Sequence, residues 1–392
     1  MLRRPNIVWI VTTQWRAQAC GYAGDPNART PWLDALASES TNYPQAVTPH
    51  PMGPQARAAL LTGKLCPLNG VSDYWDPLPV DQRTIAHAMR ERGYTTAFFG
   101  KWHLAERDRD VALVGEAHAK MLVPEQRRGG FEFWEGFESG FLINDPWLHG
   151  TRLAEPRHFK GYQSDVVGER AARWMQESHG APYFCVVSLE PPHPPYDAPA
   201  PHLKAYDAGA IVLRANVPRG GETEAQARRE LAGYYRHLEA TDRAVGRLLA
   251  EIGLGETVVV FTSVHGDMHG SHGHFRKGWP YEESVRVPLL VRHPAGAPKT
   301  DGSIVSLVDL PAMTVAWAEQ KEWSSTRQTA WISIPKASAL AKQCPFAWHG
   351  SRGARQKQIR VEPSAAAAAA GERPTELRFD LAADPFELCR LE

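Results

Sequence analysis

Short apolar runs alternate along the chain with polar loops and with stretches that repeat apolar residues at helical spacing. The apolar runs are rich in Val, Ile and aromatic residues, which is typical of strands buried on both faces of a sheet. The strands predicted in this way are 6–12, 95–99, 183–189, 257–262 and 287–292. The helices predicted are one that begins at 30–31, then 57–63, 84–93 and 224–254.

The order of these elements predicts the fold class. Strand, polar loop and helix follow one another repeatedly, which favours an α/β domain with a large, mostly parallel central sheet flanked by helices. Ligands bind such sheets at the carboxyl ends of the strands, so the polar loops are expected to converge on one site. The pattern weakens after about residue 320, and a low-complexity stretch at 364–370 precedes a last predicted strand at 376–381. We therefore expect a main domain at 1–318 and a small, shortened C-terminal α+β subdomain at 319–392.

Charge and cysteine content narrow the function classes. The 392 residues include 44 Lys and Arg against 44 Asp and Glu, so no global basic field favours nucleic acid or an anionic membrane. The five cysteines are widely spaced without a CxxC pair, which suits a reducing compartment and no disulfides. The apolar run at 7–11 is too short for a signal-peptide core, and no run reaches membrane-spanning length. These features predict a cytoplasmic protein.

Seven segments, in the same order, resemble type I sulfatases of the alkaline phosphatase superfamily, with phosphonate and phosphate ester hydrolases as close kin. They are residues 4–12, 57–63, 100–104, 192–196, 261–267, Lys277 with 281–288, and 379–385. The resemblance implies an alkaline phosphatase-like fold and a hydrolase of sulfate, phosphate or phosphonate monoesters, that is, a sulfuric ester hydrolase. It does not extend over 320–359, so the substrate is not identified.

The nucleophile position is vacant. The resemblance implies a Cys, sometimes a Ser, in a C-x-P-x-R motif, which is converted to formylglycine and attacks sulfur. Arg57 sets the register, and four residues before it the chain has Gly53. Glycine has no side chain to oxidise or to attack with, so no formylglycine forms there. Cys66 lies nine residues beyond Arg57 and is a poor substitute.

The metal motifs are also altered. The resemblance implies a divalent cation, Ca²⁺ or a similar hard metal, held by carboxylates after the first strand and in the 261–267 segment. Thr13 stands at the first carboxylate position, beside Gln14, and Val264 stands at the second, beside His265. Hard cations prefer several charged oxygen ligands, so we expect the cation to bind weakly or not at all.

The groups that handle an anion remain in place. The resemblance puts cationic or hydrogen-bonding roles on Arg57, Lys101, His103, His193 and Lys277. With two carboxylates and a metal removed, we expect a net positive pocket for a small-molecule sulfate, phosphate or carboxylate ester. A separate loop carries His265, His269, His272 and His274, which allows a transition-metal site, although a mobile polar loop is the simpler interpretation.

Three functions stay open at this point. The chain is a sulfatase-like hydrolase with impaired or altered activity, a non-catalytic pseudoenzyme that binds an anionic ligand or a partner protein, or a metal-free acid–base enzyme. General base catalysis by His103 or His193 would supply only about 10²–10⁴-fold acceleration without the formylglycine. The sequence does not determine the oligomeric state.

Overall fold

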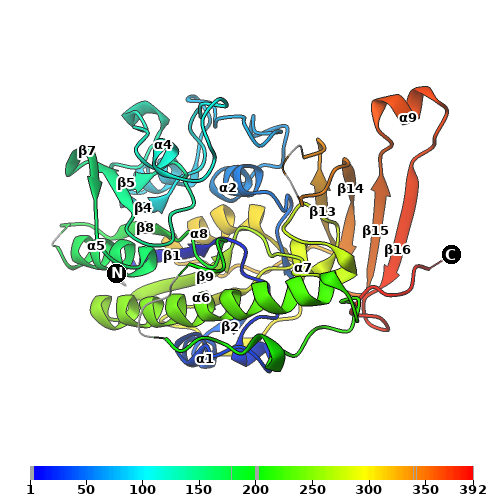
Figure 1. Cartoon of the computed structure of the whole chain (residues 1–392). Coiled ribbons are helices and arrows are strands. Elements are labelled where there is room, and N and C mark those ends of the chain that lie inside the picture. The colour runs from blue at the N-terminus through cyan, green and yellow to red at the C-terminus, as the bar shows by residue number, and fades with distance from the viewer. Residues whose placement is uncertain (1–3, 178, 199–202, 339, 341, 392) are drawn as a thin grey trace.

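The structure, a computed structural model, describes residues 4–177, 179–198, 203–338, 340 and 342–391 (Figure 1). Within these ranges a ten-stranded sheet forms the centre of the molecule. Its strands, in spatial order, are β11 (Lys299–Thr300), β2 (Thr41–Asn42), β10 (Leu289–Arg292), β9 (Thr257–Ser263), β1 (Asn6–Thr12), β8 (Tyr183–Ser188), β4 (Thr95–Lys101), β5 (Phe133–Phe137), β6 (Trp147–Gly150) and β7 (Leu153–His158). The run from β9 to β5 is parallel, whereas β10 and β6 are antiparallel to their neighbours. The predicted mostly parallel α/β sheet is therefore confirmed.

The middle strand β1 is buried on both faces. Val8 and Ile10 belong to the hydrophobic cluster on one face of the sheet, and Trp9 and Val11 belong to the cluster on the other. All four are at most 1% exposed. Complete burial of such side chains contributes about 1.5–3 kcal/mol each, which explains why this run reads as continuously apolar rather than alternating.

Helices cover both faces of the sheet. The face of Val8 is covered by α1, α5 and α6, and the face of Trp9 by α2, α3 and α8. The helices are α1 (Pro31–Ser38), α2 (Gly53–Thr62), α3 (Ile85–Arg90), α4 (Glu116–Ala119), α5 (Gln163–Gln176), α6 (Glu222–Ile252), α7 (Glu282–Val285), α8 (Leu310–Ala318) and α9 (Ala365–Ala369). Each described helix is too short or too polar to span a lipid bilayer, and all five cysteines are free.

Sequence patterns missed some of these elements. Helix α2 begins at Gly53, four residues before the predicted start, so the vacant nucleophile position lies at a helix N-terminus. The strands β5–β7 and helix α5 were not predicted. In β7 most side chains are exposed and a proline interrupts the run, which removes the apolar signal.

Parallel pairing aligns the ends of four strands. Thr12 of β1 is opposite Ser263 of β9, and Val11 is opposite Ser188 of β8. Ser188 is in turn opposite Gly100 of β4. The loops that follow these strands therefore leave the same edge of the sheet, as the sequence predicts.

The C-terminal segment forms a separate antiparallel sheet beside the main one (Figure 1). Its strands are β13 (Thr329–Ile334), β14 (Trp348–Gly353), β15 (Gln356–Val361) and β16 (Thr375–Asp380), and a two-stranded sheet pairs β3 (Ala46–Val47) with β12 (Val305–Ser306). Ile332, Trp348 and Phe379 pack in one cluster with Met52 and Trp279 of the main domain. The predicted small C-terminal α+β unit is confirmed, and it contacts the segment that leads into α2.

Buried ion pairs also join this sheet to the main domain. Glu282 at the start of α7 accepts hydrogen bonds from Arg352 Nη2 at 2.9 Å and from Lys357 Nζ at 3.2 Å. All three side chains are at most 7% exposed. Burial alone would raise the pKa of Glu282, but the charges of Arg352 and Lys357 hold it well below the ordinary value.

We predict that Glu282→Gln lowers the free energy of unfolding by about 3–5 kcal/mol, because it leaves buried cations without their counter-charge. A lowered native pKa stabilises the fold above the pKa of the unfolded glutamate, about 4.3, and this contribution is lost as the pH falls. The wild type should therefore lose stability on acidification more steeply than the variant. Chemical denaturation at several pH values measures both, with the exposed Glu372→Gln as control. Equal stability of Glu282→Gln and wild type would contradict this role.

Candidate functional site

A cavity of about 670 Å³ opens at the edge where the strand ends converge. Its wall contains seven of the residues singled out from sequence: Thr13, Gly53, Lys101, His103, His193, His265 and Lys277. Three others, Gln14, Arg57 and Val264, do not line it. Tyr74, Leu113 and Phe141 add apolar and aromatic surface, and Arg229 and Glu230 of α6 also contribute. The cavity thus combines basic groups with an apolar wall.

Gly53 is the first residue of α2, and its surroundings are already filled. The preceding Met52 is extended and provides no side-chain cap; Pro54 has no N–H and Ala56 donates to the Met52 carbonyl, so the N–H groups of Gly53 and Gln55 are the ones that could bind an anion. A Cβ atom at Gly53 would lie 2.9 Å from Nδ1 of His103, closer than such atoms approach without movement. His103 also contacts the Tyr74 hydroxyl through Nε2 at 3.3 Å. The imidazole therefore occupies space that a nucleophile side chain would need.

Arg57 lies beneath the cavity rather than in its wall. Its Nη2 donates to Thr13 Oγ1 at 2.9 Å, and its Nη1 donates to Ser188 Oγ at 2.6 Å and to the Lys101 carbonyl at 3.2 Å. Burial lowers the pKa of the guanidinium to about 10. Arg57, which the resemblance assigns to anion binding, therefore connects the ends of β1, β4 and β8 through hydrogen bonds.

Lys101 is paired with a carboxylate that sequence reasoning did not assign to the site. Its Nζ donates to Glu190 Oε1 at 2.6 Å, and both side chains are at most 1% exposed. Burial lowers the pKa of Lys101 to about 8, with Glu190 opposing the shift. Glu190 follows β8 directly, three residues before His193, so its position in the loop was the available signal. The pocket is consequently less positive than predicted.

Lys277 and His193 form a second polar group, which adjoins the first because His193 Nδ1 lies 3.7 Å from Glu190 Oε1. Lys277 Nζ lies 3.1 Å from His193 Nε2, and His193 Nδ1 donates to the Pro194 carbonyl at 2.7 Å. Burial, with the charge of Lys277, holds the pKa of His193 well below its ordinary value, so the ring is neutral. Phe141 stacks on this ring at 4.5 Å between centroids and also lies 4.5 Å from Lys101 Nζ. The aromatic ring thus contacts both the Lys101 ammonium group and the His193 ring.

The four positions that the resemblance assigns to a metal do not fit a hard divalent cation. Thr13 Oγ1 donates to the Leu189 carbonyl at 3.0 Å and accepts from Arg57. Gln14 Oε1 accepts from Lys277 Nζ at 2.6 Å. Val264 is fully buried in an apolar cluster, and only His265 presents an unpartnered atom, Nε2. One neutral imidazole nitrogen does not make a calcium or magnesium site.

Asp267 supplies no ligand either. Its Oδ1 accepts from the backbone N–H groups of His269 and Arg276 at 3.1 and 2.9 Å. Its Oδ2 accepts from Gln14 Nε2 at 2.5 Å and from the Tyr196 hydroxyl at 2.6 Å. Asp267 therefore caps local backbone, and both of its oxygens are engaged.

The histidine-rich loop is packed rather than mobile. His265 and His269 are completely buried, and His269 lies against the ring of Tyr234 at 4.3 Å between centroids. His272 and His274 stack on Tyr281 and Trp279 at 4.0 and 3.7 Å. The loop is therefore packed against the protein: Tyr234, distant in sequence, contacts the buried His269, and the nearby Tyr281 and Trp279 stack on the half-buried His272 and His274.

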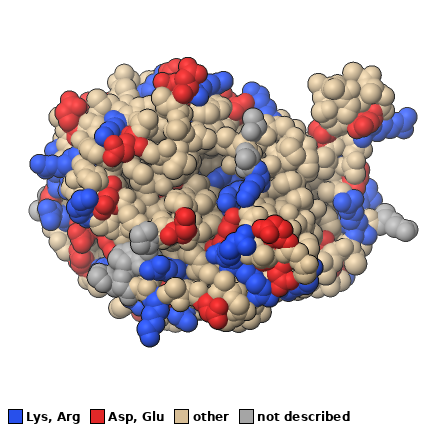
Figure 2. Space-filling view, viewed as in Figure 1, with Lys and Arg blue, Asp and Glu red and all other residues tan. Residues whose placement is uncertain are grey.

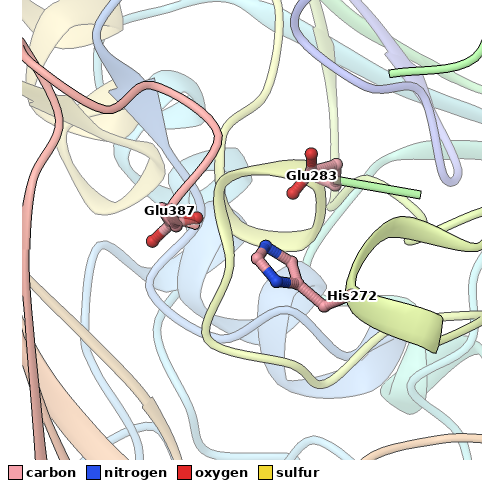
Figure 3. A group of neighbouring side chains, drawn as sticks. All are labelled: His272, Glu283 and Glu387. Atoms are coloured by element: carbon pink, nitrogen blue, oxygen red, sulfur yellow. The ribbon is translucent and has the colours of Figure 1, made fainter. Parts of the chain in front are cut away.

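One of these histidines does lie near carboxylates. His272, Glu283 and Glu387 bring one ligand atom each within 4.8 Å of one another (Figure 3). Glu283 Oε1 accepts from Arg214 Nε at 2.8 Å, and Glu387 pairs with Lys357. Each carboxylate is already paired with a cation, so the group offers no net negative charge to a metal. Its contacts join the C-terminal segment to α7.

Comparison with known proteins identifies the family of the chain. The model of the sulfatase family matches residues 5–320, which is most of the chain. The chain belongs to the sulfatase family. It is 38% identical over 314 residues to the ulvan-active sulfatase of Formosa agariphila, a match that covers 77% of this chain and 58% of that protein. The chain thus spans little more than half the length of this relative.

Solved structures of the same fold superpose over nearly the whole chain. A Bacteroides fragilis protein described as a sulfatase gives a TM-score of 0.84 at 23% identity, over 98% of this chain and 91% of that one. A protein solved with its substrate D-glucosamine-2-N,6-O-disulfate gives a TM-score of 0.79 at 20% identity, over 99% of this chain and 93% of that one. The phosphonate monoester hydrolase of Agrobacterium radiobacter gives a TM-score of 0.70 at 21% identity, over 99% of this chain and 91% of that one. At these identities the matches establish the alkaline phosphatase-like fold.

We predict that Gly53→Ala displaces the His103 imidazole and weakens its contact with Tyr74. Crowding of this kind costs about 1–3 kcal/mol of unfolding free energy. A crystal structure of the variant and its denaturation curve test both effects. Gly255→Ala is the matched control, because no atom lies within 4 Å of a Cβ at that position. An unmoved His103 ring in Gly53→Ala would contradict the prediction.

Proposed function

We propose that this sulfatase-family chain binds the sulfate group of an anionic ester in the 670 Å³ cavity and does not cleave it by the formylglycine route. The observation that carries the proposal is Gly53, which places no side chain at the nucleophile position and has His103 against it. Among the functions open from sequence, this supports the anion-binding pseudoenzyme over a conventional hydrolase.

The altered positions form one functional unit. Nucleophile and metal act together in the family reaction, so loss of either removes most of the benefit of the other. The changes at Thr13, Gly53 and Val264 fall on that unit, while the surrounding basic groups keep their contacts. Selection for binding without the family chemistry would leave this pattern.

The expected ligand is held by a local site rather than by a charged surface. Lys and Arg side chains lie among Asp and Glu over the face seen in Figure 2. Within the cavity, Lys101, Lys277 and the N-terminus of α2 are the groups that favour a negative charge. An anion that enters between them receives charge-assisted hydrogen bonds in a water-poor environment.

We infer a sulfated sugar as the ligand class. Relatives of the chain include an ulvan-active sulfatase and a protein solved with a sulfated glucosamine as its substrate. The cavity has room for a sugar residue beside the anion, and Tyr74 and Phe141 in its wall offer aromatic faces. Such walls suit the apolar face of a pyranose ring.

A second candidate, metal-free acid–base chemistry, is favoured by the contact between Lys277 Nζ and His193 Nε2 at 3.1 Å. The pair lines the cavity and can exchange a proton with a bound ligand. The two candidates differ in outcome, because only the second consumes the ligand. Mass spectrometry of a sulfated sugar after prolonged incubation with the protein distinguishes them.

We predict that the protein binds glucosamine 6-sulfate at least about tenfold more tightly than glucosamine, because a hydrogen bond to a charged group contributes about 1.5–3 kcal/mol. Isothermal titration calorimetry measures both affinities. The same preparation should show no turnover of 4-nitrophenyl sulfate in an assay where an active sulfatase serves as the positive control. Equal affinity for the two sugars would contradict sulfate recognition.

We predict that Gly53→Cys alone remains inactive when a formylglycine-generating enzyme is co-expressed. Adding Thr13→Asp and Val264→Asp should restore part of the aryl sulfatase activity, since nucleophile and metal carboxylates are then present together. Mass spectrometry confirms conversion of the cysteine, and a 4-nitrophenyl sulfate assay with Ca²⁺ measures activity. Full activity of the single variant would show that the metal positions are already competent.

A further inference from the structure

The Lys277 side chain reaches Gln14, one of the positions that the resemblance assigns to the metal. Its Nζ lies 2.6 Å from Gln14 Oε1 and 3.1 Å from His193 Nε2. The side chain lines the cavity and is only 6% exposed, so its ammonium group faces the ligand space from within the protein. An ammonium group here places positive charge beside the first family metal position.

Gln14 is fixed in the orientation that meets this charge. Its Nε2 donates to Asp267 Oδ2 at 2.5 Å and lies 3.2 Å from the Tyr196 hydroxyl. Turning the carboxamide over would place its oxygen against the Asp267 carboxylate and its NH₂ against Lys277. Its backbone has a φ of 69°, a left-handed conformation that few residues other than glycine adopt, so the surrounding structure holds Gln14 in place. The carboxamide oxygen is therefore committed to Lys277.

The other family metal positions do not oppose this arrangement. Thr13 Oγ1 is engaged by Arg57 Nη2 and the Leu189 carbonyl, and Val264 is an apolar core residue. His265 Nε2 is left as a single neutral ligand atom. Gln14 Oε1 already accepts from the ammonium group, so a divalent cation beside it would have to lie next to a positive charge, and none of the four family metal positions supplies a carboxylate to offset that repulsion.

The charge balance explains why the carboxylates and the cation would disappear together. Loss of two carboxylates removes two negative charges, and loss of a divalent cation removes two positive charges. The joint loss therefore leaves the net charge of the site unchanged. Loss of the cation alone would leave carboxylates that repel an anion, whereas loss of the carboxylates alone would leave the cation unheld. After the joint loss, Lys277 still supplies one positive charge for a sulfate monoester.

We propose that the ammonium group of Lys277, bonded to Gln14 and His193, takes the place of the divalent cation, so that the cavity binds its sulfate group without metal. This inference rests on the proposed anion-binding function and concerns how that function is performed. A metal-dependent site would place the cation next to the Lys277 ammonium group, and neither Thr13 nor Val264 supplies a negative charge to stabilise it there.

The test compares sulfate-ester binding with and without metal. Purified wild type is dialysed against EDTA and titrated with glucosamine 6-sulfate by calorimetry, then titrated again in about 10 mM Ca²⁺, above the dissociation constants of even weak calcium sites. We expect equal affinity in both, no melting-temperature shift with Ca²⁺, and no stoichiometric calcium by elemental analysis. Binding that requires Ca²⁺, or a melting temperature raised by Ca²⁺, overturns the inference and leaves the proposed function standing. Absence of binding in both conditions overturns the proposed function itself.

Variants of Lys277 supply the second arm. Lys277→Met should weaken binding at least tenfold, without rescue by Ca²⁺, whereas Lys277→Arg, which keeps the charge, should recover part of the affinity. Exposed Lys64→Met is the control. Unchanged affinity in Lys277→Met, or rescue of that variant by Ca²⁺, contradicts the role of the ammonium group. Circular dichroism confirms that each variant is folded. If one of them is not, the titrations of the wild type with and without Ca²⁺ still test the inference.

Discussion

Parallel pairing of β1 with β8 and β9 is the constraint on which the site depends. The three strands are buried over nearly their whole length, so their register is set by apolar contacts on both faces of the sheet. A slip of one residue would move every side chain of β1 to the opposite cluster. Because the register is held, Thr13, Glu190 and His265, which are distant in sequence, follow strands that end at one edge.

Arg57 holds together the segments that surround the site. Its guanidinium joins the ends of three strands through Thr13, Ser188 and the Lys101 carbonyl. A threonine hydroxyl at position 13 accepts this bond where a metal-binding carboxylate would have been committed to the cation. A threonine at position 13 therefore keeps its hydroxyl hydrogen-bonded and lowers the stability of the fold little. This is consistent with an intact framework around the substituted metal and nucleophile positions.

Pairing of buried charges governs the electrostatics of the cavity. Lys101 is paired with the Glu190 carboxylate, whereas among the described residues the Lys277 ammonium group hydrogen-bonds with the neutral acceptors Gln14 and His193. Burial, together with the nearby charge of Lys101, lowers the pKa of Lys277 to about 7. Both lysines occupy positions that the resemblance assigns to cationic groups. A ligand would nevertheless meet one ammonium group that is paired with a carboxylate and one that is not.

The sequence by itself determined the fold class, the family and the vacancy at Gly53, because these follow from local patterns and motif order. Buried parallel strands are apolar throughout, and a missing side chain is visible without coordinates. The early start of α2, the burial of the histidine-rich loop and the pairing of Lys101 with Glu190 were decided only by tertiary structure. Each depends on contacts between segments far apart in the chain, such as His269 with Tyr234 and Lys277 with Gln14. Side-chain partners of this kind are set by packing, and no spacing along the chain encodes them.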